Sequence, residues 1–238
     1  MKRLSILLTG TLMIFLSSCG SEPSKEENKA ADTTAAAPAP EPAKPVFSPF
    51  KIMYIQHKVK DFGKWEAAYT GHDSVRKAYG ITSWILGRDL KDSNLVYIAE
   101  KIDSYDKAQE FSKLPALKDV MKKAGVTSQP GFSYGEMIRG DDSEPASDLR
   151  VGVAHHVKDF AAWLKVFDAE GPATRASYGL VDRGMARSLV DSNMIYLTFV
   201  VTDLDKAKAR AASPELKKIM TDAGVDSPPT MRWYKVVK

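Results

Sequence analysis

The chain has 238 residues and a formal net charge of +4, with 44% hydrophobic and 27% charged residues. These values are typical of a soluble globular protein of one or two domains, and they exclude a fibrous or multi-span membrane protein. The positive charge is small and dispersed, so no nucleic-acid partner is predicted. Cys19 is the single cysteine, which excludes an intramolecular disulfide and a thiolate metal cluster.

Residues 1–18 have the pattern of a secretion signal. Lys2 and Arg3 precede an uncharged apolar run at 4–16, which is shorter than the roughly 20 residues that a membrane-spanning helix needs. The run ends in Leu-Ser-Ser followed by Cys19, and this resembles the lipobox of bacterial lipoproteins. The resemblance implies cleavage before Cys19 and acylation of its thiol.

A lipidated Cys19 predicts that the lipid bilayer is a partner of this chain. Acyl chains contribute about 0.8 kcal/mol per buried methylene, so three of them, palmitate being typical, would make the anchor effectively permanent. The following residue is Gly20 rather than Asp, which favours the outer membrane of the bacterial cell envelope. The alternative is an ordinary secretory signal with an incidental cysteine.

Residues 19–49 are predicted to be a disordered tether. They are rich in Ala, Pro, Glu and Lys, and they contain almost no large apolar side chain before Val46. Such a segment cannot bury enough surface to offset its ordering entropy. We therefore expect a folded body held off the membrane by this tether.

The body is predicted to be one unit present twice, at 50–139 and 149–238, with a linker at 140–148. The segment HKVKDFGKW at 57–65 matches HHVKDFAAW at 155–163 with an offset of 98 residues. A one-residue insertion then changes the offset to 99. Further matches follow in the same order: Tyr79-Gly80 with Tyr178-Gly179, Arg88 with Arg187, Asp92-Ser93-Asn94 with Asp191-Ser192-Asn193, and Ala124-Gly125-Val126 with Ala223-Gly224-Val225. Ordered matches with a single insertion indicate duplication.

Each copy is predicted to have the order β-α-β-β-α-β, the ferredoxin-like arrangement. In the first copy we expect strands at 51–59, 81–87, 95–101 and 132–138, one helix from the cap Asp61 to Gly80, and another from Ser104 to Gly125 that breaks at Pro115. The two helices cover one face of a four-stranded sheet and leave the other without a partner. The fold class is therefore α+β, with the two sheets packed against each other inside a monomeric chain.

The motif H-x-V-x-D-F-x-x-W, followed by Y-G, by R-x-L-x-D-S-N and by A-G-V, resembles the dimeric α/β-barrel superfamily. More narrowly, both copies are similar to small bacterial proteins related to antibiotic-biosynthesis monooxygenases. The resemblance implies an intramolecular dimeric α/β barrel. It leaves function open, because the superfamily includes cofactor-free oxygenases, haem-handling enzymes and isomerases.

Alternation along the first strand places Met53, Ile55, His57 and Val59 on one face, which we assign to the helix side because it is apolar apart from the histidine. His72 follows the aromatic stripe of the first helix, so we expect it to face the same space as His57. The candidate ligand-binding residues are His57, Tyr69, His72, Tyr79 and Arg88 in the first copy and His155, Glu170 and Arg187 in the second.

His57 and His155 have side chains suited to a general base or a hydrogen-bond donor; the alternative is a core histidine bonded to a backbone carbonyl or to a helix end. Arg88 and Arg187 are suited to bind a carboxylate at two points; the alternative is a pair with the nearby aspartate that braces the hairpin. Because His72 has no counterpart histidine around Glu170, the first copy is expected to have the better-formed site.

No metal site is predicted, since two imidazoles without a third ligand rarely hold zinc. No nucleotide-binding, P-loop or metalloprotease motif occurs, so no cofactor is predicted and catalytic residues stay unassigned. The predicted function is a lipid-anchored envelope protein that binds a small aromatic or acidic ligand with little or no catalysis. The alternatives are a cofactor-independent monooxygenase-like enzyme with a pocket histidine, and a protein-interaction module.

Overall fold

The computed structural model describes residues 47–238. The predicted signal peptide, Cys19 and all but the last three residues of the predicted tether lie outside this range. The elements of the first copy are β1 (Phe50–Lys58), α1 (Phe62–Gly71), α2 (Asp73–Ala78), β2 (Ile81–Asp89), β3 (Leu95–Ile102), α3 (Tyr105–Lys113), α4 (Pro115–Lys123) and β4 (Gly131–Gly140). Those of the second copy are β5 (Leu149–His156), α5 (Phe160–Glu170), α6 (Pro172–Ser177), β6 (Leu180–Ser188), β7 (Met194–Val201), α7 (Leu204–Ala211), α8 (Pro214–Asp222) and β8 (Thr230–Val236). Within 47–238, no helix is long and apolar enough to span a bilayer.

The first helix of each copy begins at the predicted cap. Asp61 accepts a hydrogen bond from the backbone N–H of Lys64 at 2.9 Å, which satisfies one of the free donors of the first turn. The single helix expected up to Gly80 is wrong, because the helix is interrupted at His72, whose ψ of 9° leaves the helical region. The second copy is interrupted at Gly171, which has a φ of +77° and is followed by a proline that begins α6.

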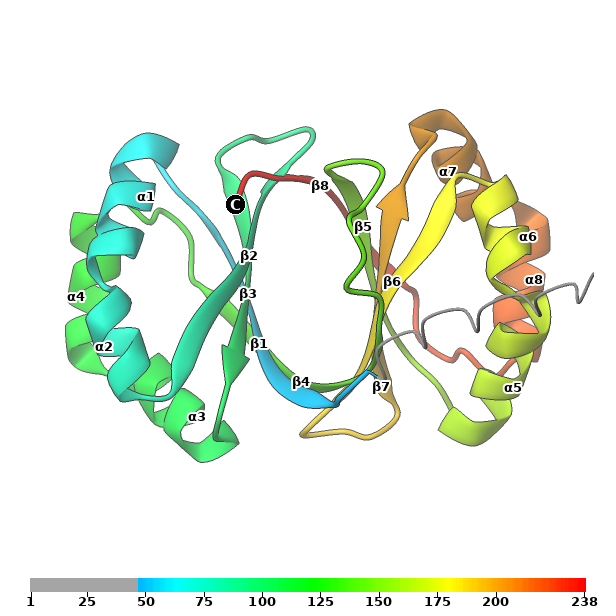
Figure 1. The fold of residues 1–238 in the computed structure, drawn as a ribbon, viewed down its shortest axis with the longest axis horizontal. Coiled ribbons are helices and arrows are strands. Elements are labelled where there is room, and N and C mark those ends of the chain that lie inside the picture. Colours follow the sequence, from blue (N-terminus) through cyan, green and yellow to red (C-terminus); the bar gives the residue numbers. More distant parts are fainter. Residues whose placement is uncertain (1–46) are drawn as a thin grey trace, which may run out of the picture. The chain divides into compact units, whose positions relative to one another are not determined.

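The strands form a closed eight-stranded barrel in the order β1-β3-β2-β8-β5-β7-β6-β4 (Figure 1). Each copy contributes four neighbouring strands in the ferredoxin-like order, which confirms the predicted fold class. The copies meet where β2 pairs with β8 and where β4 pairs with β6. The two sheets are therefore joined by hydrogen bonds along both pairs of edges, in addition to facing each other. No strand of the barrel has an unpaired edge.

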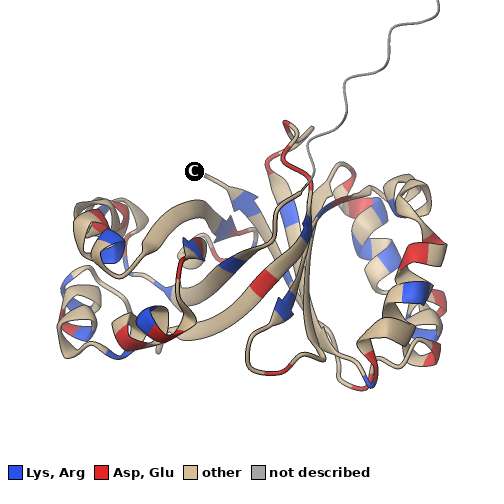
Figure 2. Ribbon diagram, turned by 60° about the horizontal axis from the view of Figure 1, so that its bottom comes forward, with Lys and Arg blue, Asp and Glu red and all other residues tan. Residues whose placement is uncertain are grey.

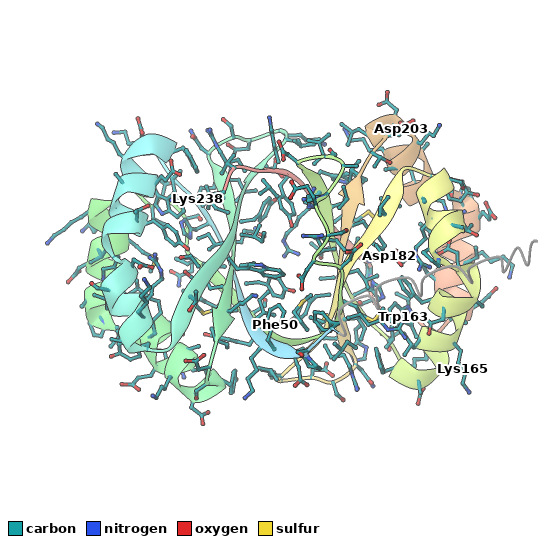
Figure 3. All side chains as sticks on the ribbon, viewed as in Figure 1. Phe50, Trp163, Lys165, Asp182, Asp203 and Lys238 are labelled. Atoms are coloured by element: carbon teal, nitrogen blue, oxygen red, sulfur yellow. The ribbon has the colours of Figure 1, made fainter. Side chains whose placement is uncertain are left out.

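The main apolar cores lie between the barrel and the helices. Met53, Ile55 and Val59 are buried against Trp65 of α1, which confirms the predicted helix-facing side of the first strand. The second copy repeats this core around Trp163, which lies on the inner side of α5, whereas Lys165 projects outward (Figure 3). Acidic and basic residues are spread over the helices of both copies (Figure 2).

The opposite face of the strands points into the barrel. Ile52, Met137 and Ala186 form a small buried cluster there. The remaining interior is a cavity of about 690 Å³, which we call the lumen. The interior of the barrel is therefore only partly filled by side chains.

Candidate functional site

The lumen is lined by side chains from both copies. Its volume of about 690 Å³ falls within the range of roughly 300–1,000 Å³ that is usual for small-molecule sites. The aromatic and polar side chains that line it include Tyr54, Gln56, Trp84, Tyr97, Ser133, Arg150, Arg183, Tyr196, Thr198, Arg232 and Tyr234. Aromatic rings and guanidinium groups are thus prominent in the lining. Along each strand, the residues that face the lumen alternate with those that face the apolar core.

The lumen is positively charged. Arg150, Arg183 and Arg232 line it together with Lys58, and no Asp or Glu lines it. Lys58 is paired with Asp92 at 2.7 Å. None of the three arginines forms an ion pair with any residue of the described range 47–238. Guanidinium groups enclosed without carboxylates favour an anion in the lumen.

Arg150 is the most buried of these arginines, with 6% of its surface exposed. Its Nη1 atom donates to the backbone carbonyls of Ser147 and Leu149. Burial, followed by the nearby charge of Arg183, lowers the pKa of Arg150 below its usual value. The side chain stays charged under all ordinary conditions, because the usual pKa of an arginine lies far above neutral pH.

Arg232 is held by the first copy. Its Nε atom donates to Gln56 Oε1 at 2.6 Å, although the two residues are 176 positions apart. In the backbone register, Arg232 lies opposite Gly152, and Tyr234 lies opposite Arg150. Two arginines and a tyrosine thus occupy neighbouring lumen-facing positions on β5 and β8.

The tyrosines of the lumen form two ring pairs. The Tyr54 and Tyr196 centroids are 5.4 Å apart, as are those of Tyr97 and Tyr234. Burial raises the pKa of Tyr234 to about 12 and raises the pKa of Tyr54 further. These phenols are therefore protonated at neutral pH. The Tyr97 hydroxyl donates to Asp89 at 3.0 Å and that of Tyr54 to Met137 Sδ at 3.5 Å, whereas the Tyr234 hydroxyl has no acceptor within residues 47–238 and is able to donate to a bound anion.

The predicted histidines lie outside the lumen proper, between sheet and helices. His57 borders the lumen, but its ring packs 5.3 Å from that of Trp65, and only 3% of the residue is exposed. His155 repeats this arrangement with Trp163 at 5.4 Å. Neither histidine has a hydrogen-bond partner for its ring nitrogens among the described residues, so the alternative of a histidine bonded to a backbone carbonyl is wrong. Burial lowers the pKa of each to about 4.

His57, Tyr69 and His72 do line one space, as the helical spacing predicted, but that cavity measures about 60 Å³. The corresponding cavity at His155 measures about 110 Å³, so the second copy has the larger space of the two. For comparison, an engineered cavity that binds benzene measures about 150 Å³. Neither cavity between sheet and helices has room for an aromatic ligand of ordinary size.

A buried ion pair occupies the cavity of the first copy. Arg76 Nε lies 3.1 Å from Glu100 Oε1, and Glu100 is fully buried. Tyr69 donates to the same carboxylate at 2.9 Å, and Arg76 lies 3.9 Å from the Tyr69 ring centroid. Burial raises the pKa of Glu100, while Arg76 opposes that rise. Tyr69 is thus engaged in a structural network rather than free for a ligand.

The second copy holds its equivalent arginine differently. Arg175, the counterpart of Arg76, binds Asp182 of β6 through Nη2 at 2.6 Å and Nε at 2.7 Å. Glu170, a predicted ligand residue, lies 3.0 Å from Arg210 and 3.5 Å from Arg175. Glu170 is therefore paired inside the protein, although it borders the cavity of this copy.

The remaining predicted residues stand apart from all three cavities. Arg88 donates to the backbone carbonyl of Ser93 at 2.7 Å and lies over the Phe62 ring. Arg187 repeats both contacts, with its Nε 2.9 Å from the Ser192 carbonyl oxygen. Each arginine braces a hairpin through this carbonyl rather than through the aspartate considered from the sequence. The Tyr79 ring packs against Phe111 at 5.6 Å.

Sequence reasoning missed the lumen residues because it treated the second strand face as a sheet-to-sheet contact. A signal was present: Tyr54, Gln56 and Lys58 alternate with the apolar set of β1, although a dry interface between sheets calls for apolar residues on both faces. No three His, Cys, Asp or Glu side chains of residues 47–238 gather closely enough to hold a metal ion.

Comparisons with known proteins place the fold without naming a function. No protein-family profile and no characterised protein matches the sequence. Among solved structures, a candidate monooxygenase from Fusobacterium nucleatum has a TM-score of 0.51 at 16% identity, covering 79% of this chain and 93% of its own. An anthrone oxidase-like protein has a TM-score of 0.52 at 14% identity, covering 79% and 92%. A candidate chlorite dismutase has a TM-score of 0.50 at 11% identity, covering 80% and 95%.

These neighbours bear out the predicted fold. Identities this low establish the shared fold alone, since one fold carries many unrelated activities. The function has to be argued from the lumen itself.

Proposed function

We propose that this protein is a lipid-anchored envelope protein whose barrel lumen binds a small aromatic or acidic ligand. The observation that carries the proposal is a cavity of about 690 Å³ inside the barrel, lined by tyrosines and arginines, with no carboxylate in its lining. Aromatic faces provide apolar contact area for a ring, and guanidinium groups provide donors for an acidic group. A lumen that is not filled also favours a binding protein over a pure interaction module.

The lining supports binding with little or no catalysis. Proton abstraction needs a group that is unprotonated near neutral pH and within hydrogen-bond reach of its substrate. The arginines of the lumen are permanently charged, and the pKa values of Tyr54, Tyr97 and Tyr234 are raised by burial. His57 borders the lumen, but burial lowers its pKa to about 4 and its ring packs on Trp65. The lumen thus offers donors and rings, but no evident general base.

The test is to identify the small molecules that co-purify with the full chain and with a variant whose lumen is filled. Gly152→Trp suits this purpose, because the nearest atom to a Cβ at Gly152 is Tyr234 Cε1 at 3.8 Å, an ordinary contact. Val190→Trp is the matched control, since Val190 is 72% exposed in the β6–β7 turn. Mass spectrometry is expected to show a bound molecule in the control and its loss in Gly152→Trp. Equal recovery from both variants would place the ligand elsewhere.

The alternative is a cofactor-independent oxygenase that uses His57 or His155. With pKa values of about 4, both histidines are unprotonated at neutral pH but are weak bases, and their cavities measure about 60 and 110 Å³. Oxygen uptake with an anthrone, the compound class in the name of one structural neighbour, tests this alternative. Uptake that His57→Leu abolishes would favour the enzyme over the binding protein.

A further inference from the structure

The lumen differs between the two copies at exactly equivalent positions. In the backbone register, Arg150 lies opposite Tyr234 and Gly152 opposite Arg232 on the β5–β8 wall. The equivalent pairs on the β1–β4 wall are Ile52 with Gly135 and Tyr54 with Ser133. One wall therefore carries two guanidinium groups and a phenol, whereas its counterpart carries no charge at these positions.

The helix-facing positions of the same strands do not diverge in this way. His57 and His155 occupy equivalent sites, each packed on the tryptophan of its own copy. Val59 and Val157 are both buried, and each forms a bridge to the valine before the last strand. At the lumen positions of these strands the two walls therefore differ in charge, and such walls suit different parts of one ligand.

The hydrogen bonds of the two arginines leave two donors free on each guanidinium group. Arg232 uses Nε for Gln56, and its two Nη groups have no partner among the described residues. Arg150 uses Nη1 for backbone carbonyls, and its Nε and Nη2 have no partner in that range. Each guanidinium thus keeps one edge with two donors, and such an edge matches the two oxygens of a planar carboxylate.

We infer that the lumen takes one aromatic carboxylate per chain, in a single orientation. The acid group lies against Arg150, Arg232 and Tyr234, and the ring lies toward Tyr54 and Tyr196, whose centroids are 5.4 Å apart. Gly152, which lies opposite Arg232, leaves room beside the guanidinium for the acid group. The inference rests on the proposed binding function and adds the ligand class, its orientation and its stoichiometry.

The test compares 2-naphthoate with 2-naphthamide, which has the same ring system without the charge. Binding is measured by calorimetry on the full chain carrying Cys19→Ser, which keeps every barrel residue. We expect one naphthoate per chain, bound about ten- to a hundredfold more tightly than the amide, as for hydrogen bonds to a charged group. Two naphthoates per chain, equal affinities for both probes, or no naphthoate binding up to about 10 mM each overturn the inference.

Two arginine variants locate the acid group. Arg232→Gln is expected to remove the preference for naphthoate, and Arg232→Lys to restore only part of it, because lysine has charge without the two-donor edge. Arg88→Gln is the matched control, since Arg88 braces a hairpin outside the lumen. Circular dichroism checks that each variant is folded. If an arginine variant does not fold, the comparison of the two probes on the unmodified barrel still tests the inference.

Gly152→Trp separates this inference from the proposed function. If it abolishes binding of both probes while Arg232→Gln changes neither, the lumen is the binding site and the carboxylate assignment is wrong. If both probes bind Gly152→Trp unchanged, the proposed lumen function fails together with the inference.

Discussion

Gln56 Oε1 accepts a hydrogen bond of 2.6 Å from Arg232 Nε, and this contact joins the two copies across the inside of the barrel. The residues are 176 positions apart, so only the closed barrel brings them together. The bond uses the Nε donor and orients the planar guanidinium. We therefore expect Gln56 to position Arg232 for the proposed carboxylate rather than to bind that carboxylate directly.

Replacing Gln56 by Ala is expected to lower the free energy of unfolding by about 1 kcal/mol, the usual net contribution of one hydrogen bond. The affinity for 2-naphthoate is expected to fall by less than in Arg232→Gln, because the charge remains and only its orientation is lost. Urea unfolding and calorimetry measure the two effects. An affinity loss as large as that of Arg232→Gln would mean that Gln56 contacts the ligand itself.

Glu100→Gln is expected to destabilise the protein by about 3–5 kcal/mol, because it leaves the buried Arg76 without its main charge partner. Arg76 is 4% exposed and lies 3.1 Å from the Glu100 carboxylate. The measurement is the urea midpoint at pH 7. Asp182→Asn in the second copy serves as the control with a smaller expected loss, since the Asp182 side chain is 39% exposed.

The second copy also suggests a rescue experiment on this ion pair, with Glu100→Phe as the destabilised variant. There the arginine is held by Asp182 from β6, and Phe199 stands at the position that corresponds to Glu100. The combination Ser83→Asp with Glu100→Phe transfers this arrangement to the first copy and is expected to recover most of the stability lost in Glu100→Phe alone. Failure to recover would show that the two carboxylate positions are not interchangeable.

The buried histidines predict a loss of stability in mild acid. Burial lowers the pKa of His57 and His155 to about 4, whereas the unfolded chain has histidine pKa values near 6.5. Between these pH values the histidines are protonated in the unfolded state but not in the folded state. The free energy of unfolding therefore falls as the pH drops from about 6.5 to about 4. The loss is of the order of 3 kcal/mol per histidine.

His57→Leu is expected to weaken this pH dependence and to be close to neutral at pH 7, because neither ring nitrogen of His57 has a hydrogen-bond partner in the described range. Urea unfolding at pH 7 and at pH 5 gives both values. A loss of several kcal/mol at pH 7 would reveal a partner that holds the imidazole.

The proposed anchor predicts that Cys19→Ser releases the protein from membranes into the soluble fraction. The thiol of Cys19, the single cysteine, is the predicted point of acylation, and without the acyl chains nothing offsets the entropy of confinement to the bilayer. Ser18→Ala is the matched control and is expected to pellet with membranes as before. A Cys19→Ser protein that stays in the membrane pellet with unchanged processing contradicts the anchor.

Residues 48–140 expressed alone are expected to form homodimers or to aggregate. Alone, this fragment would lose the β2–β8 and β4–β6 pairings and would expose the lumen face of its sheet to water. Unpaired strand edges favour self-association. Light scattering distinguishes the outcomes, and a stable monomer would show that each copy completes its core without the other.

The amino-acid sequence by itself determined the duplication, the ferredoxin-like order and the helix-facing side of the strands. Each depends on local periodicity, on capping residues such as Asp61 or on matching motifs such as 57–65 and 155–163, all of which are visible without tertiary structure. The break at His72 escaped prediction, because the aromatic stripe continues through it at helical spacing.

Only the tertiary structure decided where a ligand has room. The apolar alternation of the first strand placed the predicted site around His57, on the helix side of the sheet. There the packed side chains leave a cavity of only about 60 Å³. The sequence separation of Gln56 and Arg232 matches no recognisable motif. They come together because the barrel closes through the β2–β8 and β4–β6 pairings. A site assembled from both copies depends on which strand edges pair, and that pairing is a long-range property that no local pattern encodes.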